Sequence, residues 1–342
     1  MNRKFFLKKF LLYFFLFFLP VALIGAAMSQ YAYRNIYQSI NDKAKNKYKQ
    51  DVRYLTNTLD VFPYSGSLFN NSHVLKRVID KVIHVDSLSY VDAVCLELIT
   101  AIINNKANTS EFIDSIYLYS DNNQGNFIRS GYGFSCLKNQ VHTEWLDIFQ
   151  NTAQSVQMWI CSYPSRFYSF EKTRNVVSVF YRLNSINGAI VVNMSESALK
   201  HMLDSFASNR DEIIFVTDKE NHILFENSKS SDFFKDEKNA FSFFSQDEHL
   251  ADENFCEINI NERKYILMRS RDSTFGLCFY SITAADVLYE TPRRLLQVTG
   301  VVGAVMAFIS VILSYQITRG NQQRIANVIA IIEDAKSGCC TV

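Results

Sequence analysis

The sequence predicts an α+β protein in which one long helix precedes two antiparallel-sheet modules, all of it flanked by two membrane-spanning helices. Two apolar runs, residues 10–28 and 295–317, are each long enough to cross a hydrocarbon core of about 30 Å as a helix. Strand-like segments separated by turn-rich sequence fill most of the region between them. A folded region held between two spans is the layout expected of a receptor.

The charges beside the first apolar run predict the orientation in the membrane. Four basic residues and no acidic residue precede that run, namely Arg3, Lys4, Lys8 and Lys9. The positive-inside rule then places residues 1–9 and 318–342 in the cytoplasm and residues 29–294 outside the cell. Basic residues lie on both sides of the second run, so it adds little bias.

A cleaved signal peptide is the alternative interpretation of the first run. Ala26 and Ala27 form a weak small-residue cleavage site. However, the run is longer than the roughly 7–15 residues of a signal-peptide apolar segment, and the helical pattern continues after it. We therefore expect an uncleaved membrane anchor.

Residues 29–60 are predicted to continue this first helix out of the membrane. An apolar stripe recurs every three or four residues, at Ile36, Ile40, Ala44, Tyr48, Val52, Leu55 and Leu59. No glycine or proline interrupts it. At 1.5 Å per residue the helix extends about 45 Å. It is either a solvated stalk or a spine on which the domain packs, and the stripe favours packing.

Residues 61–207 are predicted to form the first sheet module. Helical signals, including Val74, Val78, Val82 and Ile83, precede the strands. A hairpin at 115–119 and 126–130 ends in Gly131-Tyr-Gly133, and a short helix follows at 144–150. Further segments are strands at 156–161, 175–183 and 189–194, a turn at 185–188, and a helix from 195 to 206.

Residues 208–286 are predicted to form a second, smaller module. It opens with strands 212–217 and 222–225 on either side of a tight turn at Asp218, whose place at a strand end is typical of a turn residue. Residues 228–253 are polar, rich in phenylalanine and expected to be irregular. Strands follow at 255–260, 263–270 and 275–282, and residues 284–296 lead helically into the second span.

Motif searches disfavour an enzyme and predict no metal or cofactor. The histidines lack HExxH spacing, and GxSxG, P-loop and GxGxxG signatures are absent. None of the seven cysteines has CxxC or Cys/His metal spacing, so buried thiols are favoured, with a Cys256–Cys278 disulfide as the alternative. A net charge of +1 gives no case for nucleic-acid binding. A membrane-anchored adhesion or scaffold ectodomain remains the alternative to a receptor.

The order of these segments resembles that of bacterial double-Cache sensors, the extracytoplasmic regions of many chemoreceptors, sensor kinases and membrane-bound regulators. The resemblance covers roughly residues 10–320. It rests on the segments 113–119, 126–130, 176–180 and 188–192, the Trp145 helix and the Trp159 strand, and then 213–218, 223–224, 275–277 and 281–282. It implies two PAS-like sheet modules, the first distal and the second proximal to the membrane.

The resemblance also implies that a small ligand binds on the concave side of the distal sheet. Candidate pocket residues are Tyr117, Tyr119, Arg129, Tyr132, Trp145, Trp159 and Tyr163. Small-ligand pockets combine aromatic walls with a few fixed polar groups, and an arginine can hold a carboxylate in a bidentate pair. Packing in the core is the alternative role. Of the Arg-x-Trp-Tyr motif of the amino-acid-binding subfamily only Trp145 remains, so the ligand stays open.

The segment after the second span predicts a dimeric signalling helix. Its apolar residues have 3-4-3 spacing, typical of a coiled-coil seam, at Ile325, Val328, Ile332 and Ala335. The helix resembles the start of a HAMP linker without its early Pro-Ile, or the membrane-proximal helix of AraC-type regulators. No kinase core or helix-turn-helix domain follows in this sequence. We expect that truncation removed the output domain or that a separate partner supplies it.

Overall fold

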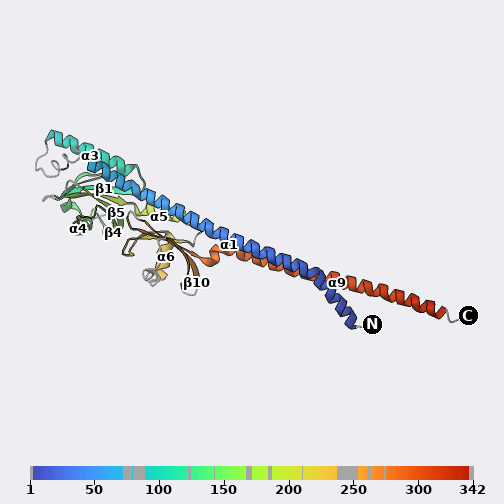
Figure 1. Ribbon diagram of the computed structural model, residues 1–342. Coiled ribbons are helices and arrows are strands. Elements are labelled where there is room, and N and C mark those ends of the chain that lie inside the picture. The colour runs from blue at the N-terminus through green and yellow to red at the C-terminus, as the bar shows by residue number, and fades with distance from the viewer. Residues whose placement is uncertain are drawn as a thin grey trace. The chain divides into compact units, whose positions relative to one another are not determined.

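A computed structural model describes most of the chain (Figure 1). The described residues are 3–71, 79, 89–121, 125–141, 143–166, 172–183, 187–209, 211–236, 253–260, 263–272 and 275–338. They fall into two compact units, one formed by residues 1–44 with 286–342 and the other by residues 45–285.

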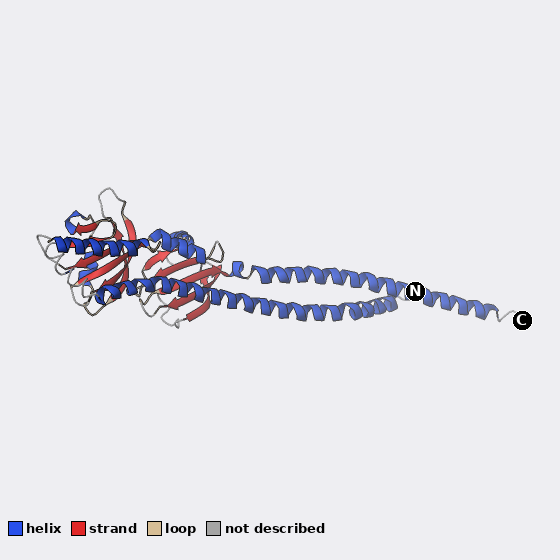
Figure 2. Cartoon of the chain, turned by 90° about the horizontal axis from the view of Figure 1, so that it is seen from above, coloured by secondary structure: helices blue, strands red, loops and turns tan. Residues whose placement is uncertain are grey.

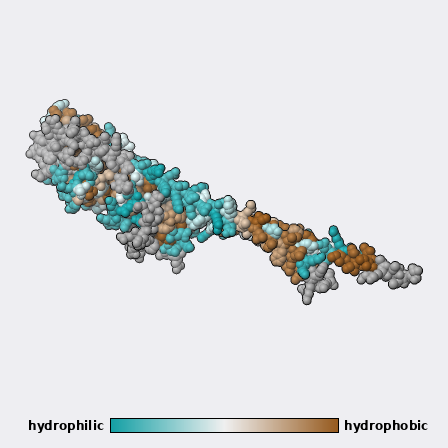
Figure 3. Space-filling model, in the orientation of Figure 1, coloured by the Kyte–Doolittle hydropathy of each residue, from teal (hydrophilic) through white to brown (hydrophobic). Residues whose placement is uncertain are grey.

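The first unit consists of two long helices that lie side by side (Figure 2). Helix α1 runs without a break from Arg3 to Asn71, and α9 runs from Glu290 to Gly338 after the short α8, Ala285–Leu288. Tyr37 stacks on Tyr289 with 4.4 Å between ring centroids, and Asn321 Nδ2 donates to Tyr13 Oη at 3.2 Å. Both helices are long and apolar enough to cross a membrane, and Figure 3 shows their hydrophobic surface in brown. The uninterrupted helix through residue 60 is confirmed, and both predicted spans lie in helices of sufficient length and hydrophobicity.

The second unit contains two antiparallel sheets. Sheet A has the strand order β3-β2-β1-β6-β5-β4. Its strands are β1 Ile113–Ser120, β2 Asn126–Arg129, β3 Gly133–Cys136, β4 Met158–Ser165, β5 Arg174–Arg182 and β6 Gly188–Met194. Its helices are α3 Tyr90–Asn108, η1 Leu137–Asn139, α4 Glu144–Asn151 and α5 Glu196–Phe206. Figure 1 shows α3 and α4 on opposite sides of the strands.

Sheet B has the strand order β8-β7-β11-β10-β9. Its strands are β7 Ile213–Thr217, β8 Ile223–Glu226, β9 Glu253–Ile260, β10 Arg263–Arg271 and β11 Cys278–Ala284. Helix α6, Ser228–Asp236, follows β8. The two sheets and their helices confirm the predicted α+β class.

Strand β4 was predicted at 156–161 and lies at Met158–Ser165, and β11 was predicted at 275–282 and lies at Cys278–Ala284. One strand and one α-helix also form where the sequence predicted neither. Gly131-Tyr-Gly133 was expected to end the hairpin, but both glycines have positive φ, 79° and 74°, and turn the chain into a third strand, β3. Residues 228–236 were expected to be irregular and form α6 instead. Asn227 explains that helix, because its Oδ1 accepts from Ser230 N at 2.9 Å and so supplies an N-cap. The predicted pattern at Val74, Val78, Val82 and Ile83 lies outside the described residues, as do residues 185 and 186 of the predicted turn.

The apolar stripe of α1 packs as a spine from Tyr48 onward. Leu55 and Leu59 are 2% and 1% exposed and join the core that contains Ile116 and Leu118 of sheet A and Ile214 of sheet B. In addition, Tyr48 Oη donates to the Phe279 carbonyl oxygen at 2.7 Å. The packing interpretation of this helix is therefore confirmed over that stretch.

The alternative disulfide between Cys256 and Cys278 does not form. Cys256 lies on β9 and Cys278 on β11, and β10 separates these two strands. Strands next to one another lie about 4.8 Å apart, so two strand spacings exceed the reach of a disulfide. Cys278 is buried, as the favoured prediction expects, whereas Cys256 is partly exposed.

Candidate functional site

An aromatic layer covers the face of sheet A that packs against α4. The alternation of side chains along each strand brings these rings to one face. They come from β1, β2, β4, β5 and α4, as Tyr117, Tyr119, Phe127, Trp145, Phe149, Trp159, Tyr163 and Phe180. Trp145 is fully buried, with ring centroids 5.4–5.6 Å from Tyr119, Tyr117 and Phe127. The opposite face carries the aliphatic side chains that meet α1 and α3.

Six of the seven predicted site residues lie in or beside this layer. Tyr117, Tyr119, Trp145 and Tyr163 are buried in it, and Trp159 packs against it, stacked on Phe180 with 5.0 Å between ring centroids.

Arg129 lies at the edge of this layer and is only 7% exposed. Its guanidinium carbon is 5.8 Å from the Tyr117 ring centroid and 4.4 Å from that of Tyr132. Tyr132 is 56% exposed, so it covers Arg129 from the solvent side. The rings fill the space over the sheet, and ligand binding by these residues stays a prediction.

A buried polar network lies beneath one end of the aromatic layer. Asn193 is at its centre and is 2% exposed. Its Oδ1 accepts from Ser178 Oγ at 2.6 Å and from Tyr163 Oη at 3.0 Å, while its Nδ2 donates to Ser115 Oγ at 2.9 Å. Four side chains from four strands are thereby fixed in orientation. Fixed polar groups on an apolar wall are what small-ligand sites use to orient their ligand.

Arg182 holds α4 against the sheet. It is 8% exposed, and its guanidinium donates to the carbonyl oxygens of Phe149 at 3.3 Å and Thr152 at 3.0 Å. These carbonyls belong to the C-terminal end of α4, where a cation is favoured by the helix dipole. The same guanidinium carbon lies 4.6 Å from the Phe149 ring centroid. The helix that covers the aromatic layer is therefore secured by one buried charge.

Burial suppresses ionisation throughout this face. Desolvation raises the pKa of Tyr117, Tyr119 and Tyr163 above their usual range, and for Tyr163 the neighbouring Tyr117 adds to the effect. Arg129 acts in the opposite direction on Tyr117, but burial outweighs it. All three phenols therefore stay neutral hydrogen-bonding groups at physiological pH.

The reactivity of the Cys161 thiol on β4 tests how strongly this face of the sheet is shielded from water. Desolvation, with a smaller contribution from Asp218, raises the pKa of its thiol from 9.0 to about 12. The thiol stabilises the fold below pH 9.0, and this contribution is lost as the pH rises toward 12, because the unfolded chain ionises first. At about pH 8 we expect iodoacetamide to alkylate Cys161 at least about tenfold more slowly in the folded chain than in urea, since the thiolate is the nucleophile. Peptide mapping by mass spectrometry measures both rates, and equal rates would contradict the partly buried placement of this thiol.

Three polar members of this site, Ser115, Ser178 and Asn193, were missed at the level of sequence. Ser115, Ser178 and Asn193 occupy inward positions in strands β1, β5 and β6, whose other inward residues are apolar or aromatic. A polar residue at an inward position of an otherwise apolar strand was the signal in the sequence that could have indicated this network. Their partners are 15 to 78 residues apart, so only the strand register brings them together.

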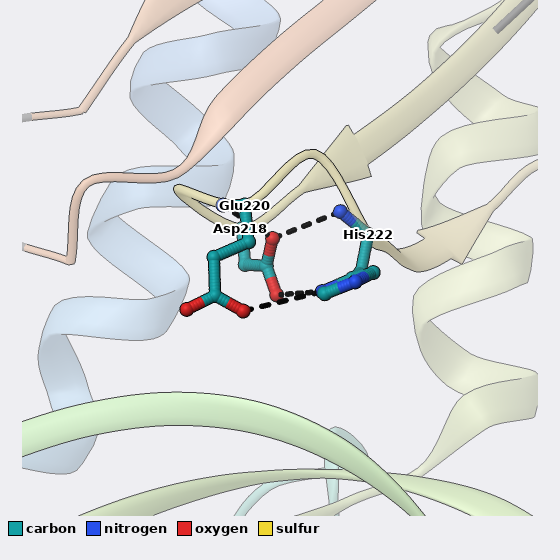
Figure 4. A group of neighbouring side chains, drawn as sticks. All are labelled: Asp218, Glu220 and His222. Carbon is teal, nitrogen blue, oxygen red and sulfur yellow. Dashed lines mark hydrogen bonds and ion pairs between the residues drawn. The ribbon is translucent and has the colours of Figure 1, made fainter. Parts of the chain in front are cut away.

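A second cluster of chemically capable side chains lies in the β7–β8 turn (Figure 4). Ligand atoms of Asp218, Glu220 and His222 lie within 4.8 Å of one another, and Glu220 and His222 are exposed. Asp218 Oδ1 accepts from the backbone N–H groups of Glu220 at 2.8 Å and His222 at 2.9 Å. Asn221 has a φ of 64°. This turn geometry accounts for the cluster, and the prediction of a turn residue at Asp218 is confirmed.

Solved structures identify the fold. The chain is similar to a domain of a sensory box/GGDEF family protein from Vibrio parahaemolyticus, with a TM-score of 0.51 and 12% identity over 73% of this chain and 98% of that one. It is also similar to the extracellular domain of the histidine kinase vpHK1S-Z8, with a TM-score of 0.50 and 13% identity over 75% of this chain and 95% of that one. The fold is that of a double-Cache sensor domain.

A more distant likeness is to the ligand-binding domain of the Campylobacter jejuni chemoreceptor Tlp3, solved with L-valine. Its TM-score is 0.46 and its identity 13%, over 73% of this chain and 96% of that one. No protein-family model and no curated protein matches the chain. The two likenesses with TM-scores of 0.51 and 0.50 show the fold alone, so the site has to be argued from its own residues.

Proposed function

We propose that this protein is a transmembrane sensor that binds a small extracellular ligand on the α4 face of sheet A. The observation that carries the proposal is the set of buried polar groups on that face. Arg129 lies buried at the edge of the aromatic layer and the network around Asn193 lies buried beneath one end of it, although burying polar groups costs free energy. The planar Arg129 guanidinium can bind a ligand carboxylate through two parallel hydrogen bonds.

Binding requires α4 to shift, because Trp145 and its neighbours fill the face. Helix α4 has only eight residues, and Arg182 holds its C-terminal end. A ligand that occupies the layer would favour an arrangement in which this helix is displaced, and it can do so only through a higher affinity for that arrangement. In this proposal the ligand takes over contacts that Trp145 makes in its absence.

The signal would then pass along continuous helices. Helix α1 contributes Leu55 and Leu59 to the core of the sheets and continues back to Arg3, and α9 follows directly after β11 and α8. We propose that both ends of the chain are cytoplasmic, as the basic residues before the first span favour. The output would be transcription regulation or a histidine kinase.

A second copy of the chain would cover the apolar seam of the cytoplasmic helix. Ile325, Val328 and Ile332 are 44–55% exposed on α9, as expected for a coiled-coil seam that lacks its partner. We therefore propose a homodimer in which this seam repacks when the ligand binds.

A thermal-shift screen of the full chain in detergent tests the proposal. The probes are small carboxylates, amino acids and sugars, and we expect one class to raise the unfolding midpoint, since a ligand at one hundred times its Kd stabilises by about 2.7 kcal/mol. The shift should vanish in Arg129→Lys, which keeps the charge but loses the planar fork, and persist in the exposed control Lys138→Gln. If no class shifts the midpoint, or if Arg129→Lys retains the full shift, the chain does not sense through this site and a scaffold role gains support.

A further inference from the structure

Helix α3 carries a row of apolar side chains on the side opposite its buried side. Large apolar residues of this row are between 41% and 85% exposed, namely Tyr90, Val91, Val94, Leu98 and Ile102. The other side is packed in the core of the sheet unit, where Ile99 and Ile103 are only 2% and 1% exposed. A contiguous exposed apolar patch on a folded domain marks an interaction surface.

The exposed side of α3 has the spacing of a coiled-coil seam. Exposed residues recur along it at intervals of three and four, as Val91, Val94, Leu98, Ala101 and Asn105. This is the a and d pattern of a heptad repeat, which packs against a second helix with the same repeat. The helix is already held in place by its buried side and by the capping box of Ser89 and Asp92, so pairing orders no new backbone.

The size of this seam indicates which partner can use it. Residues 91–105 span about 22 Å of a helix about 10 Å wide, so the seam covers roughly 220 Å² on each copy. Stable interfaces bury about 800 Å² on each partner. A different protein docked on α3 alone would therefore bind weakly. A second copy that is already held through the α9 seam would meet α3 at a high effective concentration.

We propose that the α3 helices of two copies pair in parallel and in register through this seam. The pairing rests in part on the homodimer proposed above and adds a second contact between the two chains. Asn105 favours this register, because a polar residue at an a position specifies how the helices align. Glu97 flanks the seam, and in an antiparallel pair centred on Leu98 the two Glu97 carboxylates would lie side by side and repel.

Cysteine cross-linking of the full chain in membranes tests the pairing. Ala101→Cys places a thiol on the seam, and the matched control Ala93→Cys places one at an exposed position of α3 outside it. Under oxidation with copper phenanthroline we expect at least about fivefold more linked dimer from Ala101→Cys, because a disulfide forms only where the Cα atoms lie within about 7 Å. Peptide mapping assigns the link to residue 101, and the wild-type chain gives the background from its own cysteines.

A seam variant and a cytoplasmic cross-link separate this contact from the homodimer as a whole. Adding Leu98→Glu to Ala101→Cys brings like charges together in the seam and should lower the linked fraction to that of Ala93→Cys. Leu98 is 57% exposed, so the substitution should cost the single chain little stability. A link through Val328→Cys in α9 reports the cytoplasmic seam and should persist when Leu98→Glu is present.

Three outcomes would overturn the proposal. They are equal linking of Ala101→Cys and Ala93→Cys, a link at residue 101 that Leu98→Glu leaves unchanged, and a link from residue 101 only to a different protein. If Val328→Cys still links in these cases, the homodimer stands and the α3 contact alone is wrong. Thermal midpoints show whether each variant is folded, and Val91→Glu, at a position 66% exposed, takes the place of Leu98→Glu if that variant does not fold.

Discussion

Replacing Trp145 with alanine is expected to lower the free energy of unfolding of the sheet unit by about 3–5 kcal/mol, the range for a large buried aromatic residue. The indole is fully buried, packs on the rings of Tyr117, Tyr119 and Phe127, and donates from Nε1 to Gln140 Oε1 at 3.1 Å. Its loss leaves a cavity under α4 and an unpaired amide. Urea unfolding of the full chain in detergent, followed by the fluorescence of Trp159, measures the change.

Tyr132→Ala is the matched control for this substitution. Tyr132 was predicted from sequence to share the site, but it is 56% exposed, so its removal should cost about 0.5 kcal/mol or less. A loss below about 1 kcal/mol in Trp145→Ala would show that the indole is not part of a packed layer. If the proposed ligand displaces Trp145, a saturating ligand should also reduce the difference between Trp145→Ala and the wild-type chain.

Asn193→Leu is expected to have the second-largest effect, a loss of at least about 2 kcal/mol, because each buried polar group left without its partner costs about 1–3 kcal/mol. The substitution leaves the hydroxyls of Tyr163, Ser178 and Ser115 without their shared amide. The control is Asn187→Leu, whose Nδ2 donates to Asp121 in an exposed pair, and about 0.5 kcal/mol is expected there.

A combined variant shows whether the loss of stability in Asn193→Leu comes from the broken hydrogen-bond network or from the different shape of leucine. Adding Ser115→Ala and Ser178→Ala to Asn193→Leu removes two of the three hydroxyls that lose their hydrogen bond to Asn193. The combined loss should therefore be smaller than the sum of the separate losses, because residues of one network are coupled. Strict additivity would argue that these side chains act independently, and the network would then have no role in fixing the site.

Much of the fold could be predicted from residue pattern. Strands β1, β5, β7 and β10 were found within two residues of their observed bounds, because their apolar and β-branched composition is a local property. The two elements that were missed have weak local signals. Strand β3 is four residues long and partly exposed, and α6 begins in a serine-rich segment whose cap, Asn227, lies just before it.

The candidate site was predicted only in part, for a different physical reason. Aromatic side chains at Tyr117, Tyr119 and Trp145 are recognisable as large apolar groups that a module must bury. The buried residues Ser115, Ser178 and Asn193 stabilise the site only through the hydrogen bonds that they make to one another. Ser178 and Asn193 are 15 residues apart in the chain, and Ser115 and Asn193 are 78 apart. Their contact depends on the register of β1, β6 and β5, which no local pattern specifies.

The sequence by itself determined the two long apolar helices, the unbroken course of α1 and the alternating strands, because hydrophobic length and periodicity depend only on residue order. Only the tertiary structure decided that the aromatic face is closed by α4, that Asn193 joins four strands, and that α3 packs in the core through only one of its two apolar sides. These features arise where segments distant in the chain come into contact. Their energies come from burial and pairing that exist only after the sheets have formed.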